Sequence, residues 1–234
     1  MGDFGQAGAA AIELILGADT KLWSVVVLSL KVSIAATVIA GLIGLPLGAL
    51  IALKAFPGRH VAIVVLNAFM GLPPVVVGLA VYLMLSRAGP LGPLGLLFTP
   101  GAMIVAQALL VTPIVAALAR QTIADAWTDY REQLTSLGAG PVQAAATLLY
   151  DCRMSLMTAM LAGFGRAAAE VGAVLVVGGN IDGVTRVMTT SIALETSKGD
   201  LPLALGLGLV LMGIVLAVNG LALALRVAAS RQGA

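Results

Sequence analysis

The chain has 234 residues, of which 60% are hydrophobic and only 10% are charged, and its formal net charge is +2. Its mean hydropathy of +1.06 is far above that of an ordinary soluble domain. This composition excludes a soluble enzyme, and the small net charge gives no support for nucleic-acid binding. We therefore predict an all-α protein, a polytopic bundle of membrane helices that lies in a lipid bilayer.

The first 31 residues mix apolar residues with Glu13, Asp19, Lys21 and Lys31. Such a mixture suits a helix that lies at the membrane surface, so residues 1–31 are expected to form an interfacial lead-in helix. The segment lacks the basic start and the short apolar run of a cleavable signal peptide. We therefore expect the chain to insert through its own helices.

Five segments between residues 32 and 225 are long and apolar enough to cross a bilayer, which takes roughly 20 residues. Four of them contain no charged residue, and the fifth contains only Arg166 and Glu170. The five segments are 32–53, 61–86, 101–119, 154–177 and 201–225. The sequence thus predicts a transmembrane domain of about five helices over residues 32–225, followed by a cytoplasmic tail at 226–234.

Lysines and arginines are distributed unequally between the connecting segments. With the N-terminus outside, the cytoplasmic segments contain Lys54, Arg59, Arg120, Arg131, Arg153, Arg226 and Arg231. The outer segments contain Lys21, Arg87, Arg186 and Lys198. Because basic residues favour the cytoplasmic side, the N-terminus is predicted to lie outside and the C-terminus inside.

Prolines interrupt two of the predicted spans. Pro73 and Pro74 lie in the second span, and Pro113 lies in the third. Each proline removes a backbone donor and bends its helix, so the freed carbonyl groups must face protein or water. The kinks can mark a translocation pathway, or they can only help irregular helices to pack.

The longest polar connection covers residues 120–153 on the predicted cytoplasmic side. Gly138, Gly140 and Pro141 interrupt an otherwise helical pattern there. They supply the backbone freedom and the break that a turn between two short helices needs. We expect this elbow to present a surface to a cytoplasmic partner.

Arg166 and Glu170 lie four residues apart in the fourth span. A charge inside a span costs about 3 kcal/mol, and a continuous helix would place both residues on one face, where they neutralise each other. The pair can line a polar pathway, or it can lock the fourth span to a neighbouring helix. In the outer connection that follows, residues 185–196 are compatible with a helix too short and polar to cross alone.

The sequence contains no Gly-x-x-x-x-Gly-Lys-Ser/Thr loop, so this chain alone is not expected to hydrolyse ATP. Cys152 and His60 are the only residues of their kinds. Neither an internal disulfide, a metal site nor a catalytic triad is therefore predicted. We expect a chain without catalytic residues.

The elbow run from Glu132 to Gly140, followed by Val142-Gln143-Ala144, resembles the EAA loop of permease subunits of ATP-binding-cassette (ABC) importers. In that family the loop docks into a groove on the ATPase subunit. Two alanines of the motif are replaced here by Gln133 and Leu134. The resemblance implies that the residues that couple to the ATPase are Glu132, Leu137, Gly138, Ala139 and Gln143.

A second run, residues 164–173 with Gly178-Gly179-Asn180 after it, resembles the Arg-x-x-x-Glu-x-Gly signature of sulfate, molybdate and tungstate permeases. Segments 71–78, 97–103 and 185–192 look most like tungstate permeases. The resemblance covers residues 20 to 225. It implies the fold of a type I ABC importer permease.

The resemblance also implies a function and a set of partners. The chain would be the permease subunit of a tungstate importer in a prokaryotic plasma (inner) membrane, with molybdate or sulfate as alternative substrates. It would form a homodimer and bind two ATPase subunits, which hold the ATP, while an extracytoplasmic tungstate- or molybdate-binding protein delivers the anion. No cofactor or metal is expected in this chain.

A pathway for a tetrahedral dianion needs hydrogen-bond donors and few fixed charges, so that the anion can leave again. The candidate pathway residues are Pro73, Pro74, Arg166, Glu170, Asn180, Thr189, Thr190 and Ser191. The hydroxyls among them can also merely satisfy helix carbonyls. Two other classes of protein are alternatives to the importer. One is a secondary anion transporter or channel without an ATPase, and the other is a membrane scaffold.

Overall fold

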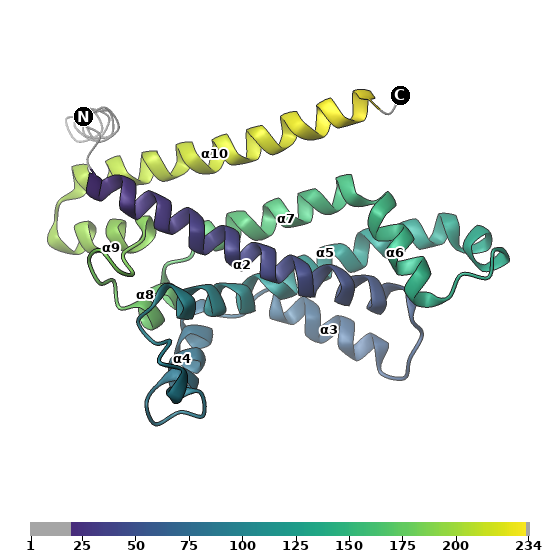
Figure 1. Cartoon of the computed structure of the whole chain (residues 1–234), viewed down its shortest axis with the longest axis horizontal. Coiled ribbons are helices and arrows are strands. Elements are labelled where there is room, and N and C mark those ends of the chain that lie inside the picture. The colour runs from purple at the N-terminus through teal and green to yellow at the C-terminus, as the bar shows by residue number, and fades with distance from the viewer. Residues whose placement is uncertain (1–19, 233–234) are drawn as a thin grey trace. The chain divides into compact units, whose positions relative to one another are not determined.

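A computed structural model describes the backbone of residues 20–232 and the side chains of residues 22–224. Within this part of the chain every regular element is a helix (Figure 1). The helices divide between two compact units. Unit 1 contains the described residues up to Val32, Gly78–Met103 and the residues from Ala168 onward, whereas unit 2 contains Ser33–Val77 and Ile104–Ala167.

The elements in chain order are α2 (Thr20–Leu53), α3 (Arg59–Phe69), α4 (Pro74–Leu85), the 3₁₀ turn η1 (Gly92–Leu94), α5 (Pro100–Ser136), α6 (Pro141–Asp151), α7 (Arg153–Ala168), α8 (Gly172–Gly178), α9 (Met188–Lys198) and α10 (Leu201–Gln232). Three stretches, Leu22–Leu53, Pro100–Ser136 and Leu201–Ala224, are each long and apolar enough to cross a membrane. The interrupted pairs α3–α4 and α7–α8 bring the number to five if each pair is one span. The predicted all-α membrane architecture is thus confirmed.

The first and last helices extend beyond the boundaries expected from the sequence. α2 runs unbroken from Thr20, so residues 20–31 are its first turns and not a separate lead-in helix. α10 continues to Gln232, so residues 226–232 extend a helix where a separate tail was expected. No glycine or proline occurs at either expected boundary, so nothing ends the helix there. Each residue that is added to a helix also adds a backbone hydrogen bond. Residues 1–19 and 233–234 lie outside the described residues.

α5 is also longer than the sequence suggested. It has 37 residues, and Pro113 lies inside it without ending it. Residues 120–136 therefore continue this helix, and the expectation of a separate short helix before the elbow is wrong. No glycine or proline occurs between residues 114 and 136, so nothing stops the helix as it enters the polar connection.

Small residues let the helices of unit 2 approach closely. Gly44 and Gly48 lie one turn apart on α2, and a Cβ atom at Gly48 would overlap the carbonyl oxygen of Ala116 on α5. A Gly-x-x-x-Gly pair of this kind brings two helix backbones together in lipid. Val111 and Val115 of α5 are completely buried in this unit.

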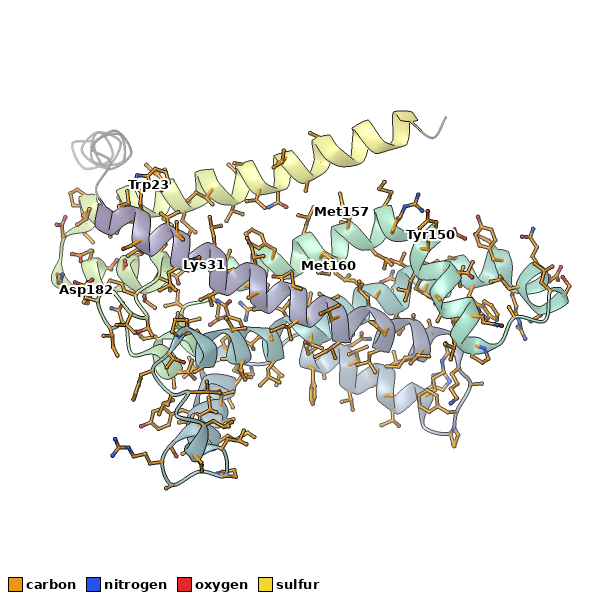
Figure 2. All side chains as sticks on the ribbon, in the orientation of Figure 1. Trp23, Lys31, Tyr150, Met157, Met160 and Asp182 are labelled. Carbon is orange, nitrogen blue, oxygen red and sulfur yellow. The ribbon has the colours of Figure 1, made fainter. Side chains whose placement is uncertain are left out.

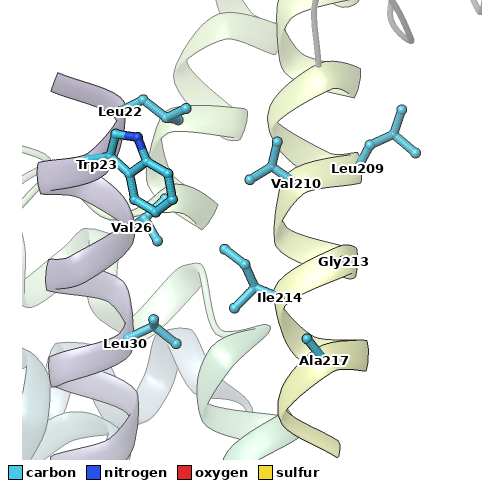
Figure 3. A pocket seen from close by; sticks show the side chains of 9 residues that line it. All are labelled: Leu22, Trp23, Val26, Leu30, Leu209, Val210, Gly213, Ile214 and Ala217. Atoms are coloured by element: carbon cyan, nitrogen blue, oxygen red, sulfur yellow. The ribbon is translucent and has the colours of Figure 1, made fainter. Parts of the chain in front are cut away.

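Unit 1 joins the first turns of α2 to α9 and α10, which lie beside them in Figure 1. Leu22 and Val26 of α2 form a buried cluster with Met188 of α9 and Leu207 of α10. α2 and α10 also border a groove of about 390 Å³, and all of the described residues that line it are apolar (Figure 3). Only 17% of the apolar window of α10 is buried within the chain, which leaves most of this helix to face lipid or another chain.

Candidate functional site

The first candidate site is the elbow between α5 and α6. Gly138 follows the end of α5 and has φ +73°, a left-handed conformation that glycine adopts without steric cost. The N–H groups of Gly138 and Ala139 donate to the carbonyl oxygens of Thr135 at 3.0 Å and Leu134 at 2.9 Å. These bonds close the end of α5 in the usual manner of a glycine-terminated helix. The predicted turn at Gly138 is confirmed.

α6 begins with a cap from its own first turn. The side chain of Gln143 accepts a hydrogen bond from the N–H of Gly140 at 3.0 Å. Pro141 takes the first helical position, where the missing N–H costs nothing. Gln143 therefore helps to fix the direction in which α6 leaves the elbow.

The elbow exposes apolar side chains. Leu137 is 81% exposed and Val142 is 72% exposed, although neither lies in an apolar span. Glu132 and Gln143 are exposed as well, whereas Ala139 is half-buried. Large apolar side chains that stand out of a polar connection are typical of a contact with another protein.

The other face of the elbow is packed onto the helices of unit 2. Leu148 of α6 is completely buried and forms a cluster with Ile123 of α5 and Leu156 of α7. Ala49 and Ala52 of α2 belong to the same cluster. Because a close-packed core has low compressibility, a force on the elbow would reach α2, α5 and α7 together.

The second candidate site surrounds Glu170, which is only 3% exposed. α7 ends at Ala168 and α8 begins at Gly172, so Glu170 lies between two helices. The expected placement of Arg166 and Glu170 on one helical face is therefore wrong. The carboxylate of Glu170 accepts a hydrogen bond from the N–H of Ala173 at 3.0 Å, which caps the N-terminus of α8. Arg166 lies half-buried in the last turn of α7.

Thr189, Thr190 and Ser191 are all buried in the first turn of α9. The Thr189 hydroxyl donates to the carbonyl of Glu170 at 2.9 Å, and the Thr190 hydroxyl donates to the carbonyl of Val187 at 3.0 Å. These two hydroxyls satisfy backbone carbonyls, as one of the two interpretations expected. The Ser191 hydroxyl has no hydrogen-bond partner within the described part of the chain. Of the three, it is the one left to bind a ligand.

The loop between α8 and α9 is held by Thr185, which the sequence analysis did not single out. Thr185 is completely buried. Its hydroxyl donates to the carbonyl of Gly178 and accepts from the N–H of Ile181 at 3.0 Å. Asn180 in this loop has φ +50°, and its side-chain oxygen has no partner among the residues described. The sequence gives little indication that this threonine holds the loop. Its role depends on which backbone carbonyl group the fold brings close to its hydroxyl.

Pro73 and Pro74 separate two helices instead of bending one. α3 ends at Phe69 and α4 begins at Pro74, because proline suits the first position of a helix and disfavours helix in the residue before it. α4 then runs close to α8, since a Cβ atom at Gly78 would lie 2.7 Å from the Cα of Ala173. The prolines thus set where α4 starts, and Gly78 sets how near α8 it lies.

Comparison with known proteins adds a separate observation. The chain is 42% identical to the tungstate uptake system permease protein TupB of Peptoclostridium acidaminophilum, over 90% of this chain and 92% of that protein. It is 40% identical to a probable anion ABC transporter permease protein of Haloferax volcanii, over 86% of this chain and 89% of that protein. The TupB protein of Campylobacter jejuni is 38% identical over 66% of this chain and 65% of its own length. Permease proteins of sulfate and molybdenum transport systems are more distant, and no family model matches the chain.

Proposed function

The chain belongs to the permease proteins of anion ABC transporters, and from this premise we propose that it is the membrane subunit of an ATP-driven tungstate importer. One observation carries the proposal: the similarity to a permease named for tungstate uptake extends over 90% of the chain. Molybdate and sulfate are the second and third candidate substrates, because the permeases named for them are less similar. The protein is a multi-pass protein of the prokaryotic inner membrane.

The energy for transport comes from ATP that is bound by separate subunits. This chain has no phosphate-binding loop in its sequence, and its elbow exposes Leu137 and Val142. The importer contains two copies of this chain and two ATPase subunits, each docked on one elbow. An extracytoplasmic binding protein delivers the anion. The N-terminus lies outside and the elbow lies in the cytoplasm, which follows from the distribution of lysine and arginine.

Movement of the ATPase subunits reaches the membrane helices through the elbow. Closure of the ATPase pair around ATP pushes on the exposed tip of the elbow. Leu148 transmits the push because it packs against Ile123 of α5 and Leu156 of α7. The helices then rock between an inward-open and an outward-open arrangement, which is alternating access.

The pathway attracts tungstate only weakly. Ser191 supports this view, because its buried hydroxyl lacks a partner in the described part of the chain and can donate to an oxyanion. Arg166 supplies positive charge at membrane depth. Glu170, Thr189 and Thr190 hold the helices at the break, and Asn180 presents a side-chain amide from the adjoining loop. A pathway with few fixed charges lets the anion leave.

Reconstitution tests the function. The chain, its ATPase and its binding protein are placed in proteoliposomes, and uptake of tungstate, molybdate and sulfate is measured with ATP or with a non-hydrolysable analogue. We expect accumulation of tungstate that requires ATP hydrolysis. Uptake that continues without hydrolysis would favour a secondary transporter or channel, and a complex that hydrolyses ATP but takes up none of the anions would contradict the proposal. The affinity of the binding protein for each anion shows whether selectivity resides there.

A further inference from the structure

A second groove lies in unit 2, between α2 and the start of α7. It has a volume of about 490 Å³. α2 lines it from Val38 to Pro46, and the opposite side is lined by residues between Leu149 and Met160. Of the described residues that line it, all are apolar except Arg153. Figure 2 labels Met157 and Met160, the two flexible apolar side chains on the α7 side.

The two ends of this groove differ, because α2 and α7 run in opposite directions. Met160 lies against Gly41, where a Cβ atom would come within 2.5 Å of the Met160 Cε. Leu156 packs with Ala49, two turns further along α2. Arg153, the first residue of α7, therefore lies at the end of the groove near the elbow, and Met160 lies at the other end.

The position of the groove in α2 determines what kind of molecule can fill it. Its α2 side belongs to a stretch that is long and apolar enough to cross a membrane. Leu42 is 72% exposed and Val38 is 49% exposed there. From Val38 to Pro46 the helix rises about 12 Å, at 1.5 Å per residue. A flexible apolar chain from the surrounding bilayer suits a groove of this length and lining, because it removes no polar group from water.

Arg153 specifies the headgroup at the end of the groove. Its guanidinium lies 4.3 Å from the centre of the Tyr150 ring and donates to the Tyr150 carbonyl at 2.8 Å. These contacts hold the cation beside the groove, and its remaining donors match the oxygens of a phosphate. Asp151 is also exposed nearby, but it does not line the groove. By contrast, the described residues that line the groove between α2 and α10 carry no charge and specify no headgroup (Figure 3).

We infer that the groove between α2 and α7 binds one anionic phospholipid, with an acyl chain along Leu42 and Met157 and the headgroup phosphate on Arg153. The inference rests on a match between the groove and a phospholipid. The apolar lining suits an acyl chain, and the Arg153 guanidinium suits an anionic headgroup. Arginine and tyrosine at the end of a membrane helix are typical of the headgroup level of a bilayer. The bound lipid would lie next to the elbow, where the helices receive the push from the cytoplasm.

Lipid binding to the purified full-length chain tests the inference. The chain is delipidated in detergent, titrated with phosphatidylglycerol or phosphatidylcholine, and examined by native mass spectrometry. We expect one phosphatidylglycerol to bind in preference to phosphatidylcholine. Arg153→Gln should lower that preference about fivefold, since a basic residue near an anionic lipid contributes about 1 kcal/mol. Arg153→Lys should keep most of it, and Arg131→Gln, which removes an exposed charge elsewhere in the elbow, should leave it unchanged.

A second pair of variants tests the acyl-chain site. Leu42→Trp places a large side chain in the groove and should weaken binding of both lipids. Ile43→Trp is the matched control, because Ile43 is 53% exposed on the same helix but does not line the groove. Equal binding of the two lipids by the unchanged protein, or equal loss in Arg131→Gln and Arg153→Gln, would overturn the inference. So would a Leu42→Trp variant that separates two copies of the chain and leaves lipid binding intact, since the groove would then be an interface between copies.

Neither measurement involves transport. The outcome is therefore independent of which anion the permease carries.

Discussion

The elbow and the segment around Glu170 are both breaks between helices, but they differ in what they leave exposed. At the elbow, Leu137 and Val142 stand out from the chain. Around Glu170, the carboxylate and the Thr189 hydroxyl are buried, and both are hydrogen-bonded to backbone groups. Exposed apolar side chains at a break are typical of a contact with another protein, whereas the Glu170 carboxylate and the Thr189 hydroxyl already have hydrogen-bond partners within the chain. Substitutions at the elbow should therefore affect coupling, and substitutions of Glu170 and Thr189 should affect folding.

Gly138→Pro is the strongest test of this difference. Proline cannot adopt φ +73°, so the elbow must rearrange while the membrane helices stay inserted. We expect ATP-dependent uptake to be abolished in proteoliposomes while ATP hydrolysis continues. Gly199→Pro is the matched control, because Gly199 has φ +83° in a turn outside the elbow. Uptake at the normal rate by Gly138→Pro would contradict the docking role of the elbow.

Glu170→Ala should have the next largest effect, and the effect should be on stability. It removes a buried charged acceptor from the N–H of Ala173, which costs about 2–3 kcal/mol of the free energy of unfolding. Thermal unfolding in detergent and the yield of monodisperse protein report the loss. Asp182→Ala is the control, because Asp182 forms an exposed ion pair with Arg186 at 2.9 Å, and its removal should change stability by about 0.5 kcal/mol or less. Normal stability of Glu170→Ala with altered tungstate flux would assign Glu170 to the pathway.

Leu137→Asp combined with Val142→Asp should weaken binding of the ATPase. Apolar residues at the centre of a protein interface contribute about 2 kcal/mol, which corresponds to a loss of affinity of about thirtyfold. The thermal stability of the isolated chain should not change, because both side chains are exposed. Leu94→Asp serves for comparison, since Leu94 is 60% exposed in η1 and lies outside the elbow. Equal ATPase affinity in the elbow variant and in Leu94→Asp would exclude these two residues from docking.

The smallest effects on stability are expected when single hydroxyl groups of α9 are removed, at Thr189 and at Ser191. Thr189→Val removes a hydrogen bond to the Glu170 carbonyl and should cost about 1 kcal/mol of stability. Ser191→Ala removes a hydroxyl that has no partner among the described residues, so stability should change by less than about 0.5 kcal/mol. If Ser191 contacts the anion, its variant should raise the KM for tungstate severalfold. An unchanged KM would exclude Ser191 from the pathway.

Several features of both sites were predictable because they depend on residues close together in the chain. Gly138, Gly140 and Pro141 predicted the turn, since only glycine takes its left-handed conformation without cost. The placement of Arg166 and Glu170 on one continuous helix was wrong, because α7 ends at Ala168. No glycine or proline occurs between Ala168 and Val171, so no helix-breaking residue in the sequence shows that α7 ends at Ala168.

The sequence alone determined the membrane class, about five apolar segments and the position of the elbow, because these depend on the length of apolar runs and on local backbone preferences. Only the tertiary structure decided that Glu170 caps α8, that Thr189 donates to a backbone carbonyl and that Ser191 finds no partner among the residues described. It also decided that Arg153 borders an apolar groove. Such roles depend on which helix lies opposite a side chain, and the contacts between helices join residues that are far apart in the chain.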